Sequence, residues 1–468
     1  MTINSTMQTE KERPFKVLIA GGSIAGLTLA NALARANIDF LVLESHGRID
    51  PSVGAALTVP TNACRILDQM GIYDDIQAHI QPTADIYTYV EDGRLLAIMD
   101  MPRVIWERHS YPIAWLTREQ LLRILYDNVP DKSKVLLNKK ITRVDHSDDG
   151  VVAHCEDGSE YNGSMIAGAD GVHSTIRGEM WKHMEESREW KKRVKEDRKA
   201  MAAEYACIFG ISRPMVELKP GIIYRTWGKD FTTFANVGEG NQVFWVLFTK
   251  MDRKFQYPSV PKFTRKEQDE LAKKFMDTHV GAGIKFGSVY ENATTSSFVP
   301  LEEGTCKSWT WGRFACLGDS VHKTTPNIGQ GASLAIDDAA SLANHIVSIV
   351  NSSGGMPSSG DITTALTKWE AGLRPRAKAV CDAGATYMRL EALANWPLKI
   401  AALYIAPHVG RVFADLLSVV DTGAPTLHFL ALPERKGDSV STEKGENGRK
   451  WKVSWYIRAF WAANLRLK

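Results

Sequence analysis

The chain has 468 residues, a length that allows two or three domains and a core that needs no disulfides. Lysine and arginine exceed aspartate and glutamate by only 57 to 54, so the charge does not indicate a nucleic-acid-binding protein. The six cysteines include no Cys-x-x-Cys pair, and no two histidines lie three or four residues apart. We therefore expect neither a disulfide framework nor a metal site. The first 14 residues are polar and mixed in charge, which predicts a disordered N-terminus without a secretory signal.

The first apolar segment has the pattern of a strand–helix–strand unit. The run FKVLIA leads into the glycine turn GGSIAG, and a second apolar run ends in Glu44. In such a turn Gly21 permits the bend, Gly26 lets helix and strand pack closely, and the helix N-terminus faces a pyrophosphate. Glu44 would accept hydrogen bonds from an adenosine ribose. These residues predict a dinucleotide site, although Ser23 replaces the middle glycine of the usual pattern.

Aromatic and β-branched strands are predicted between residues 204 and 248, in the order YACIFGI, GIIYRTW, FTTFANV and QVFWVLF. They are typical of an antiparallel sheet with one buried face, which would be a second domain inserted into the first. The charged stretch 179–199 before them is typical of a solvated surface. After them, the buried strand in GRFACLGD and the helix pattern GASLAIDDAASLANHIVSIV return the chain to the first domain.

Two further motifs point to one ligand. The first is GADGVHSTIR around Asp170, and the second begins at Asp319 and continues through Gly329, Gly331 and Ala332 into the long helix. A carboxylate at the end of a strand can hold a ribityl hydroxyl, and a glycine-rich helix start offers free N–H groups and a positive dipole end. A reduced flavin is negatively charged at one ring edge, whereas NAD would not need this second site. The three motifs together predict FAD.

In this order of motifs, the sequence resembles the FAD-dependent monooxygenases of the para-hydroxybenzoate hydroxylase type over about residues 15–390. The resemblance implies an α/β fold, with a Rossmann-like FAD-binding domain, an inserted antiparallel β-sheet substrate domain and a helical C-terminal region. It also implies FAD as the cofactor and NAD(P)H as the reductant. Within this type, RGEMW and DSVHKTTPNIGQG are most similar to fungal epoxidases that act on prenylated meroterpenoid or indole-terpene intermediates.

The resemblance also assigns site residues. It places Arg118 near the pyrophosphate and the ribityl chain, Gly331 and Ala332 beside the isoalloxazine, and Asp170 in a motif linked to both FAD and NAD(P)H. Thr58 stands where a glycine is expected beside the flavin, so its side chain would narrow that wall. The predicted cofactor-binding residues are Gly21, Gly26, Glu44, Gly54, Ala55, Thr58, Arg118, Asp170, Asp319, Gly329, Gly331 and Ala332.

These patterns divide the chain into discontinuous parts. We expect the FAD-binding domain in residues 15–80, 113–178 and 305–390, and the substrate domain in residues 81–112 and 179–304. A helical region (391–433), a linker (434–450) and an aromatic, basic tail helix (451–468) would follow.

The tail has four cations and no acid, which suits a helix in a membrane interface. A terminal helix docked on its own domain is the alternative. No full transmembrane helix is predicted, and the expected location is cytoplasmic, with contact to an intracellular membrane surface through the tail.

The resemblance implies an enzyme that uses NAD(P)H and O₂ to epoxidise a prenyl-chain alkene through a C4a-hydroperoxyflavin. An isolated alkene needs no protein base, whereas a phenol hydroxylase benefits from one. Tyr224 and Arg225 are candidates to orient the substrate, with purely structural roles as the alternative, so no catalytic side chain is assigned. The aromatic residues that would bind a terpenoid tail or pack the core are Phe231, Phe234, Phe244 and Trp245.

Two other functions remain open at this point. An aromatic hydroxylase of the same fold would add oxygen to a phenol ring, and a non-catalytic protein would bind a prenyl lipid on a flavoprotein fold. A hydrolase is disfavoured because the sequence has no G-x-S-x-G elbow. For the epoxidase, a terpene cyclase would be the expected downstream partner.

Overall fold

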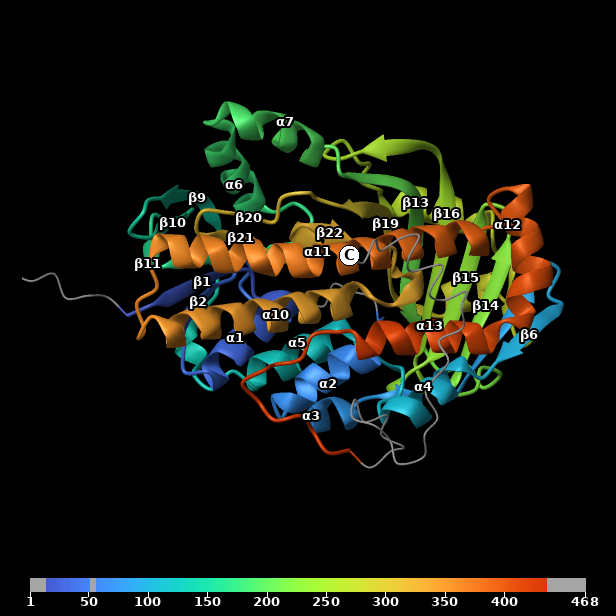
Figure 1. Ribbon diagram of the computed structural model, residues 1–468. Helices are drawn as coiled ribbons and strands as arrows, with labels where there is room; N and C mark the ends of the chain where they lie inside the picture. Colours follow the sequence, from blue (N-terminus) through green and yellow to red (C-terminus); the bar gives the residue numbers. More distant parts are fainter. Residues whose placement is uncertain (1–13, 51–55, 436–468) are drawn as a thin grey trace, which may run out of the picture.

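The protein is described by a computed structural model that covers residues 14–50 and 56–435. A mostly parallel sheet and a large antiparallel sheet form the two halves of the molecule, and helix α11 (Ser359–Glu391) runs from one to the other (Figure 1). This arrangement confirms the predicted α/β fold with an inserted sheet and a helical C-terminal region. The linker and tail helix predicted beyond residue 435, and the N-terminal 13 residues, lie outside the described part of the chain.

The parallel sheet has the strand order β20-β21-β12-β1-β2-β8. Its strands are β1 (Lys16–Ala20), β2 (Asp39–Leu43), β8 (Val135–Leu136), β12 (Met165–Gly168), β20 (Thr310–Trp311) and β21 (Phe314–Cys316). Only β20 runs antiparallel to its neighbour in this sheet. From Val17 to Ala20, β1 is completely apolar and buried, as expected for a central strand covered on both faces.

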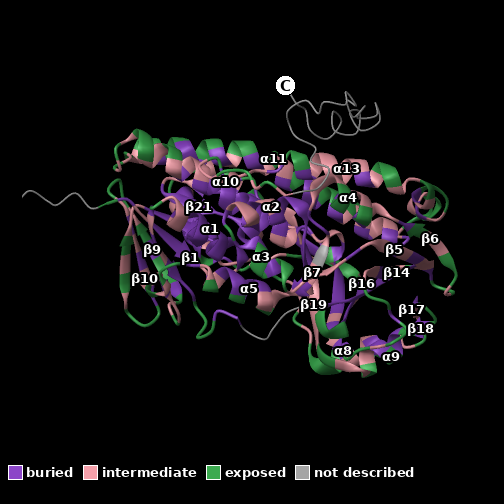
Figure 2. Ribbon diagram, turned by 90° about the horizontal axis from the view of Figure 1, so that it is seen from below, coloured by how far each residue is buried: buried purple, intermediate pink, exposed green. Residues whose placement is uncertain are grey.

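Helices surround this sheet. The Ala/Leu-rich α1 (Ile24–Arg35) is buried from Ile24 to Leu33 because it packs against α10 (Gly331–Ser352). Figure 2 shows buried residues concentrated around β1, α1 and α2, with exposed residues along α11. The helices that complete this half are α2 (Thr61–Gln69), α3 (Tyr73–Gln77), α5 (Arg118–Asp127), α6 (Thr175–Glu185) and α7 (Arg188–Asp197).

The large sheet has the order β22-β19-β13-β16-β15-β14-β5-β6. Its strands are β5 (Asp85–Val90), β6 (Leu95–Met99), β13 (Met201–Ser212), β14 (Ile222–Gly228), β15 (Phe231–Val237), β16 (Val243–Gln256), β19 (Ala293–Thr305) and β22 (His322–Lys323). Every neighbouring pair is antiparallel except β5 and β14, which are parallel. Two segments far apart in the sequence therefore build one sheet.

Smaller elements fill the space around the two sheets. A three-stranded sheet joins β3 (Ala56–Val59), β7 (Ala114–Thr117) and β4 (Gln81–Pro82). The remaining elements are β9 (Ile141–His146), β10 (Val151–Cys155), β11 (Glu160–Gly163), β17 (His279–Gly281), β18 (Ile284–Lys285), α4 (Met101–His109), α8 (Arg265–Lys273) and α9 (Phe286–Glu291).

The segment that precedes the large sheet differs from its predicted role. Residues 179–199 were expected to be a solvated part of the substrate domain, but Met180, Trp181, Met184 and Val194 are buried in the core of the parallel sheet. The reason is amphipathicity, since α6 and α7 present their few apolar side chains to this core and their charges to solvent. By packing, α6 and α7 belong with the first half of the molecule.

The C-terminal region caps the far end of the large sheet. It consists of α12 (Trp396–Ile400), a π-helical turn (Ala401–Ile405), a 3₁₀ turn (Ala406–His408) and α13 (Gly410–Thr422). Across the described ranges, 14–50 and 56–435, no single helix is long and apolar enough to cross a membrane. The segments Trp396–His408 and Gly410–Thr422 meet that criterion only as a pair, and they are bent by 89°.

Candidate cofactor and substrate site

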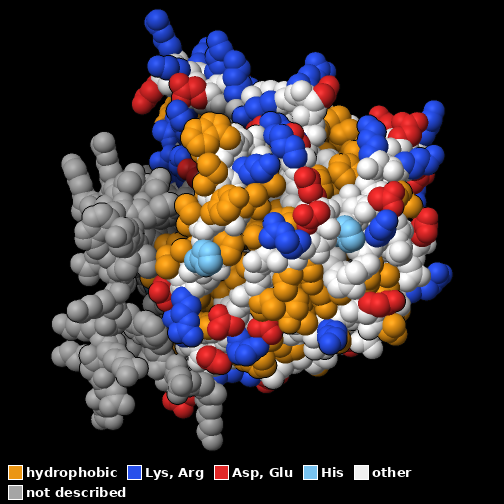
Figure 3. Space-filling model, turned by 90° about the vertical axis from the view of Figure 1, so that its right-hand side faces the viewer, with side chains coloured by type: hydrophobic (Ala, Val, Ile, Leu, Met, Phe, Trp, Pro, Cys, Tyr) orange, Lys and Arg blue, Asp and Glu red, His pale blue; other side chains and the backbone are white. Residues whose placement is uncertain are grey.

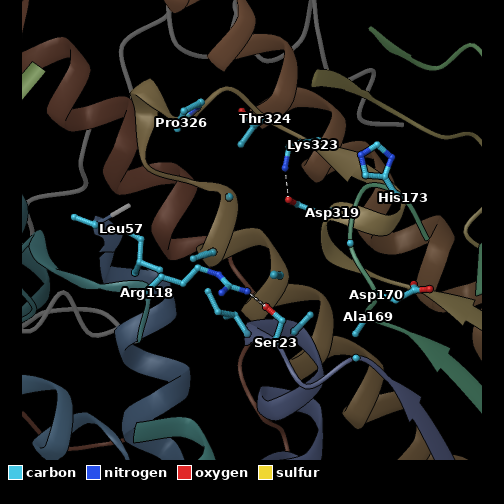
Figure 4. Close-up of a pocket in the computed structure, with 18 of the residues that line it drawn as sticks. Ser23, Leu57, Arg118, Ala169, Asp170, His173, Asp319, Lys323, Thr324 and Pro326 are labelled. Carbon is cyan, nitrogen blue, oxygen red and sulfur yellow. Dashed lines mark hydrogen bonds and ion pairs between the residues drawn. The ribbon is translucent and has the colours of Figure 1, made fainter. Parts of the chain in front are cut away.

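A cavity of about 910 Å³ lies between the carboxyl ends of the parallel strands and the large sheet. In open α/β sheets this edge is the usual ligand site. The lining includes Ala20 at the end of β1, Ala169 after β12, Asp319 after β21 and Phe234 of β15. Figure 4 shows part of this lining, with Ser23, Arg118 and Asp319 around the same space. The three sequence motifs therefore converge on one cavity.

The turn between β1 and α1 needs its glycines. Gly21 has φ +103°, and a Cβ atom on it would lie 2.6 Å from the Ala169 carbonyl oxygen. A Cβ on Gly26 would lie 2.0 Å from the Gly21 carbonyl oxygen, so a side chain there is excluded. Ser23 makes no side-chain cap to α1, and its hydroxyl instead accepts a hydrogen bond from Arg118 Nη2 at 2.9 Å. The first N–H groups of α1 are thus available to an anion beside the Arg118 cation.

Glu44 lies at the end of β2, beside this turn. Its carboxylate accepts hydrogen bonds from the Gly22 N–H at 2.6 Å and from the His46 N–H at 2.8 Å. Burial favours the neutral form of Glu44, but these hydrogen bonds and the His46 ring outweigh it and hold the pKa below its usual value. An ionised carboxylate at this position is suited to accept hydrogen bonds from the hydroxyl groups of a ribose.

Asp319 and the start of α10 form the opposite wall. The Asp319 carboxylate pairs with Lys323, a residue that the sequence analysis did not select. The side chain of Asp319 is 40% exposed. Gly331, the first residue of α10, has open space where a Cβ would be, with the nearest atom 4.0 Å away. The N-cap, Gln330, makes no side-chain capping bond, so the N-terminus of α10 also keeps free N–H groups at the cavity.

Thr58 and Gly329 are in direct contact. The Thr58 hydroxyl donates to the Gly329 carbonyl oxygen at 2.8 Å, and a Cβ on Gly329 would lie 2.1 Å from the same hydroxyl oxygen. Gly329 has φ +66°, a conformation that favours glycine. Thr58 therefore anchors β3 to the loop before α10, and the two predicted residues form one side of the cavity wall. Gly54 and Ala55, also predicted, lie outside the described residues.

Asp170 lies at the cavity, but its carboxylate is already engaged. It accepts hydrogen bonds from the Ser174 hydroxyl at 2.5 Å and the Ile176 N–H at 3.0 Å. Burial raises the pKa of Asp170, although these hydrogen bonds oppose that shift. In Figure 4 the side chain points away from Asp319 and Arg118. Asp170 thus holds the start of α6, and a direct contact with a nucleotide stays a prediction.

Together these groups fit FAD. The cavity offers a carboxylate for a ribose, an uncapped helix N-terminus with Arg118 for a pyrophosphate, and Asp319 for ribityl hydroxyls. The second uncapped helix N-terminus, at Gly331, would face the electron-rich edge of the ring. No group of three His, Cys, Asp or Glu side chains in the described part of the chain could hold a metal ion.

The half of the cavity under the large sheet is mostly apolar. Cys207 and Phe209 reach it from alternate positions of β13, and Val246 and Phe248 do so from alternate positions of β16. Trp115 packs against Phe234, with ring centroids 4.7 Å apart. Of these residues, the sequence analysis selected only Phe234. The two-residue periodicity of β13 and β16 was the available signal for the others.

Arg225 and Glu391 form an ion pair in the apolar half. Arg225 Nη1 donates to Glu391 Oε1 at 2.5 Å, and its Nη2 donates to the Asn327 carbonyl oxygen at 3.1 Å. The Asn327 side chain in turn donates to Glu391 Oε2 at 3.2 Å. Burial disfavours the Arg225 cation, but the Glu391 carboxylate outweighs burial and raises the pKa of Arg225. Arg225 is thus a fixed cation at the cavity wall.

Tyr224, the other candidate, is separated from Arg225 by the alternation of the strand. It is 2% exposed, packs in the core on the opposite side of the sheet, and accepts a hydrogen bond from the Lys219 N–H at 3.0 Å. Tyr224 therefore does not reach a ligand in this cavity, which corrects its prediction as a pocket residue. Phe231 and Trp245 lie in the same core, and Phe244 is 4% exposed against Gly238, so among the four predicted aromatics Phe234 alone lines the cavity.

Comparison with known sequences adds a second line of information. A family described as "FAD binding domain" matches residues 14–206 and 225–358. The FAD-dependent monooxygenase spyC of Aspergillus fumigatus is 40% identical over 90% of this chain and 89% of its own length. The FAD-dependent monooxygenase paxM of Penicillium paxilli is 36% identical over 93% of this chain and 91% of its own. The FAD-dependent monooxygenase cdmI of Talaromyces verruculosus is also 36% identical, over 92% of this chain and 90% of its own length.

Solved structures with the same fold are more distant in sequence. HpxO of Klebsiella pneumoniae, solved with FAD and uric acid, has a TM-score of 0.73 at 20% identity and covers 88% of this chain and 97% of its own. CtdE, solved with FAD and a substrate, has a TM-score of 0.67 at 17% identity and covers 87% and 99%. At these identities the similarity establishes the fold alone.

Proposed function

Since this chain belongs to the FAD-dependent monooxygenases, we propose that it epoxidises a prenyl-chain alkene of a secondary-metabolite intermediate, with NAD(P)H as the reductant. When bound, FAD supplies the redox chemistry by which one oxygen atom of O₂ is transferred to the substrate. The protein would hold the cofactor through Glu44, the N-termini of α1 and α10, and Asp319. The large sheet would position the substrate and exclude water.

The observation that carries this proposal is the mostly apolar lining under the large sheet, where Glu391 and Cys207 are both poor proton acceptors. Among the described lining residues under the large sheet, the carboxylate of Glu391 is held by Arg225, and burial raises the pKa of the Cys207 thiol to about 12. Neither group would accept a proton from a phenol at neutral pH. An alkene requires no such acceptor, and the Trp115 and Phe234 rings offer an apolar surface for a prenyl chain.

Arg225 would orient the substrate rather than exchange protons with it. Its cation is held by Glu391 and Asn327, so a hydroxyl or carbonyl oxygen of the substrate would meet a fixed hydrogen-bond donor. Such an anchor would place one end of the molecule and leave the apolar chain to reach toward the flavin. The product epoxide would be a substrate for an enzyme that opens epoxides by protonation, such as a terpene cyclase.

The experiment that tests this proposal is product analysis on the purified protein supplied with FAD. It would be incubated with NADPH or NADH, isotopically labelled O₂ and a panel of prenylated aromatic and indole acceptors. We expect one labelled oxygen atom in the product and loss of a prenyl alkene, with the aromatic ring unchanged. A labelled hydroxyl on the ring, with every alkene intact, would assign the protein to the aromatic hydroxylases instead. A chain that binds the acceptors but never FAD would be a binding protein.

A further inference from the structure

The C-terminal helices and the edge strand β6 expose an unusually apolar surface. Trp396 is 75% exposed and Tyr404 is 70% exposed, so these large aromatic side chains contribute little to the core. We define the α12–β6 surface by its exposed apolar residues, Leu95, Ile98, Trp396, Ile400, Tyr404, Ile405 and Val412. Figure 3 shows this side of the molecule, where hydrophobic side chains form extended areas among basic and acidic groups.

From α12 to the first turn of α13 this surface carries basic side chains and no acid, and Asp415, which follows, pairs with Arg108. From residue 392 to residue 414 the sequence contains no aspartate or glutamate, but it contains Lys399, His408 and Arg411. Tryptophan and tyrosine are the residues that prefer a lipid–water interface, and cations beside them attract anionic headgroups. Trp396–His408 and Gly410–Thr422 are each too short to span a bilayer alone, and the 89° bend between them suits two segments that lie at the interface.

This charge pattern also decides which partner fits. A two-fold contact between copies of this chain would bring a second pair of Lys399 and Arg411 cations to the same interface, which disfavours that contact. The segment 451–468 carries four cations and no acid, so it would be repelled in the same way. An anionic phospholipid surface complements both the exposed apolar side chains and the cations.

The α12–β6 surface is directly connected to the cavity. Glu391, which holds Arg225, ends α11 five residues before Trp396. Phe413 of α13 contacts Tyr387, with ring centroids 6.1 Å apart, and the Arg225 guanidinium lies 5.7 Å from the Tyr387 ring centroid. A molecule docked through this surface would therefore hold the wall of its substrate cavity close to the lipid.

We propose that the α12–β6 surface docks this protein on anionic phospholipid membranes, with the apolar side chains at the depth of the headgroups. Docking depends on the surface alone and does not require the proposed epoxidation. It would give an enzyme with an apolar cavity access to apolar molecules dissolved in the membrane.

Vesicle binding of the full chain tests the proposal. Flotation would be measured with phosphatidylcholine vesicles, with and without phosphatidylserine. We expect the double variant Trp396→Ser, Tyr404→Ser to bind about tenfold or more weakly than the unchanged chain, because two interfacial aromatic side chains are lost. We expect Lys399→Glu, Arg411→Glu to lose the preference for phosphatidylserine. The matched control is Val216→Ser, whose side chain is 93% exposed between β13 and β14, and which should bind normally.

Three results would overturn the proposal. In the first, the unchanged chain fails to float with either vesicle. In the second, the Trp396 and Tyr404 variant floats normally, and binding is lost only when the tail aromatics at 451, 455, 456, 460 and 461 are replaced by serine. In the third, this variant changes the sedimentation of the protein from dimer to monomer without affecting flotation, which would assign the surface to a second copy. The FAD content of each variant reports whether it is folded.

Discussion

Arg225 is a permanently charged residue in an apolar wall, and its hydrogen bonds to Glu391 and Asn327 stabilise that charge. The side chain of Arg225 is 12% exposed and that of Glu391 is 2% exposed. A buried ion pair adds little net stability, because desolvation of both groups offsets their attraction. Retaining such a pair beside a ligand cavity is therefore better explained by positioning than by stability. Separating these two roles requires variants of each partner and of both together.

We expect Arg225→Gln to lower the free energy of unfolding by about 3–5 kcal/mol, because Glu391 would remain buried without its cation. Glu391→Gln should cost a similar amount. The double variant should cost clearly less than the sum of the two, since it leaves no unpaired charge. Urea unfolding followed by flavin fluorescence measures all three variants.

The matched control is Arg103, which pairs with Asp85 at 2.7 Å but is 51% exposed. Arg103→Gln should change the free energy of unfolding by less than about 1 kcal/mol. Strictly additive costs for Arg225→Gln and Glu391→Gln would show that the pair is not coupled. If the double variant is stable, binds FAD and converts substrate at the normal rate, the positioning role of Arg225 is wrong.

At the scale of single elements, the sequence predicts the helices, strands and turns whose patterns lie within one short segment of the chain. The turn from β1 to α1 and the glycine-rich start of α10 were predicted because steric exclusion at Gly21, Gly26 and Gly329 leaves few residue choices. The pairing of β5 with β14 was not, because parallel pairing of segments more than 130 residues apart has no local pattern. The length of α11 could not be predicted either, because the helix continues through Pro375 and a proline inside a helix usually breaks it.

The residues of the site divide in the same way, into those found in local motifs and those brought to the cavity by tertiary packing. Residues in the motifs could be selected from sequence, whereas Trp115, Phe209 and Glu391 reach the cavity through tertiary packing of separate elements. Tyr224 was selected beside Arg225, although the two side chains of adjacent strand residues must point to opposite faces. Which face is buried against a helix and which against a ligand depends on the neighbouring layers.

Helix α13 is attached to the rest of the molecule by buried charges. Arg376 donates to Asp337 at 3.0 Å and to the Val420 carbonyl oxygen of α13 at 2.8 Å. Arg65 Nη2 donates to the Asp421 carbonyl oxygen at 3.1 Å. Burial raises the pKa of the Asp421 carboxyl to about 7, a shift that Arg376 opposes and Asp337 reinforces. Deprotonation of Asp421 therefore places a second buried carboxylate near Asp337.

This raised pKa gives a definite pH dependence. The folded state keeps a proton on Asp421 up to about pH 7, whereas an unfolded aspartate loses it near pH 4. The Asp421 contribution to stability is thus fully present below about pH 4 and is lost as the pH rises to about 7. We expect Asp421→Asn, which cannot ionise, to be more stable than the unchanged protein by about 1–4 kcal/mol at pH 8.

The advantage of Asp421→Asn should shrink as the pH is lowered toward 4, and urea midpoints at several pH values would measure it. The control on the same helix is Asp415→Asn, where the side chain is 42% exposed and pairs with Arg108. We expect it to change stability by less than about 1 kcal/mol at each pH. An Asp421→Asn variant that is less stable at pH 8 than at pH 5, relative to the unchanged protein, would contradict the assignment.

At the scale of the whole molecule, the two halves are joined by α11 and by the cavity between them. Ile362, Leu366 and Trp369 of α11 are buried in the core of the parallel sheet, and Met388 of the same helix is buried in the core of the large sheet. A cofactor in the cavity would touch both halves, from Glu44 at one end to the large sheet at the other. FAD should therefore stabilise the molecule as a unit and not only the domain that carries its motifs.

Linkage sets the size of this effect. With free FAD at about 100 times its dissociation constant, the free energy of unfolding should rise by about 2.7 kcal/mol over that of the FAD-free protein. Hydrogen exchange measured on peptides from β1 and from β15 would report the two halves separately, and both should gain protection together. FMN lacks the adenosine half that Glu44 would hold, so at equal concentration it should protect both halves much less. Protection confined to β1 would mean that FAD binds one domain without bridging to the sheet that holds Arg225, and the shared cavity would then not be the site of oxygen transfer.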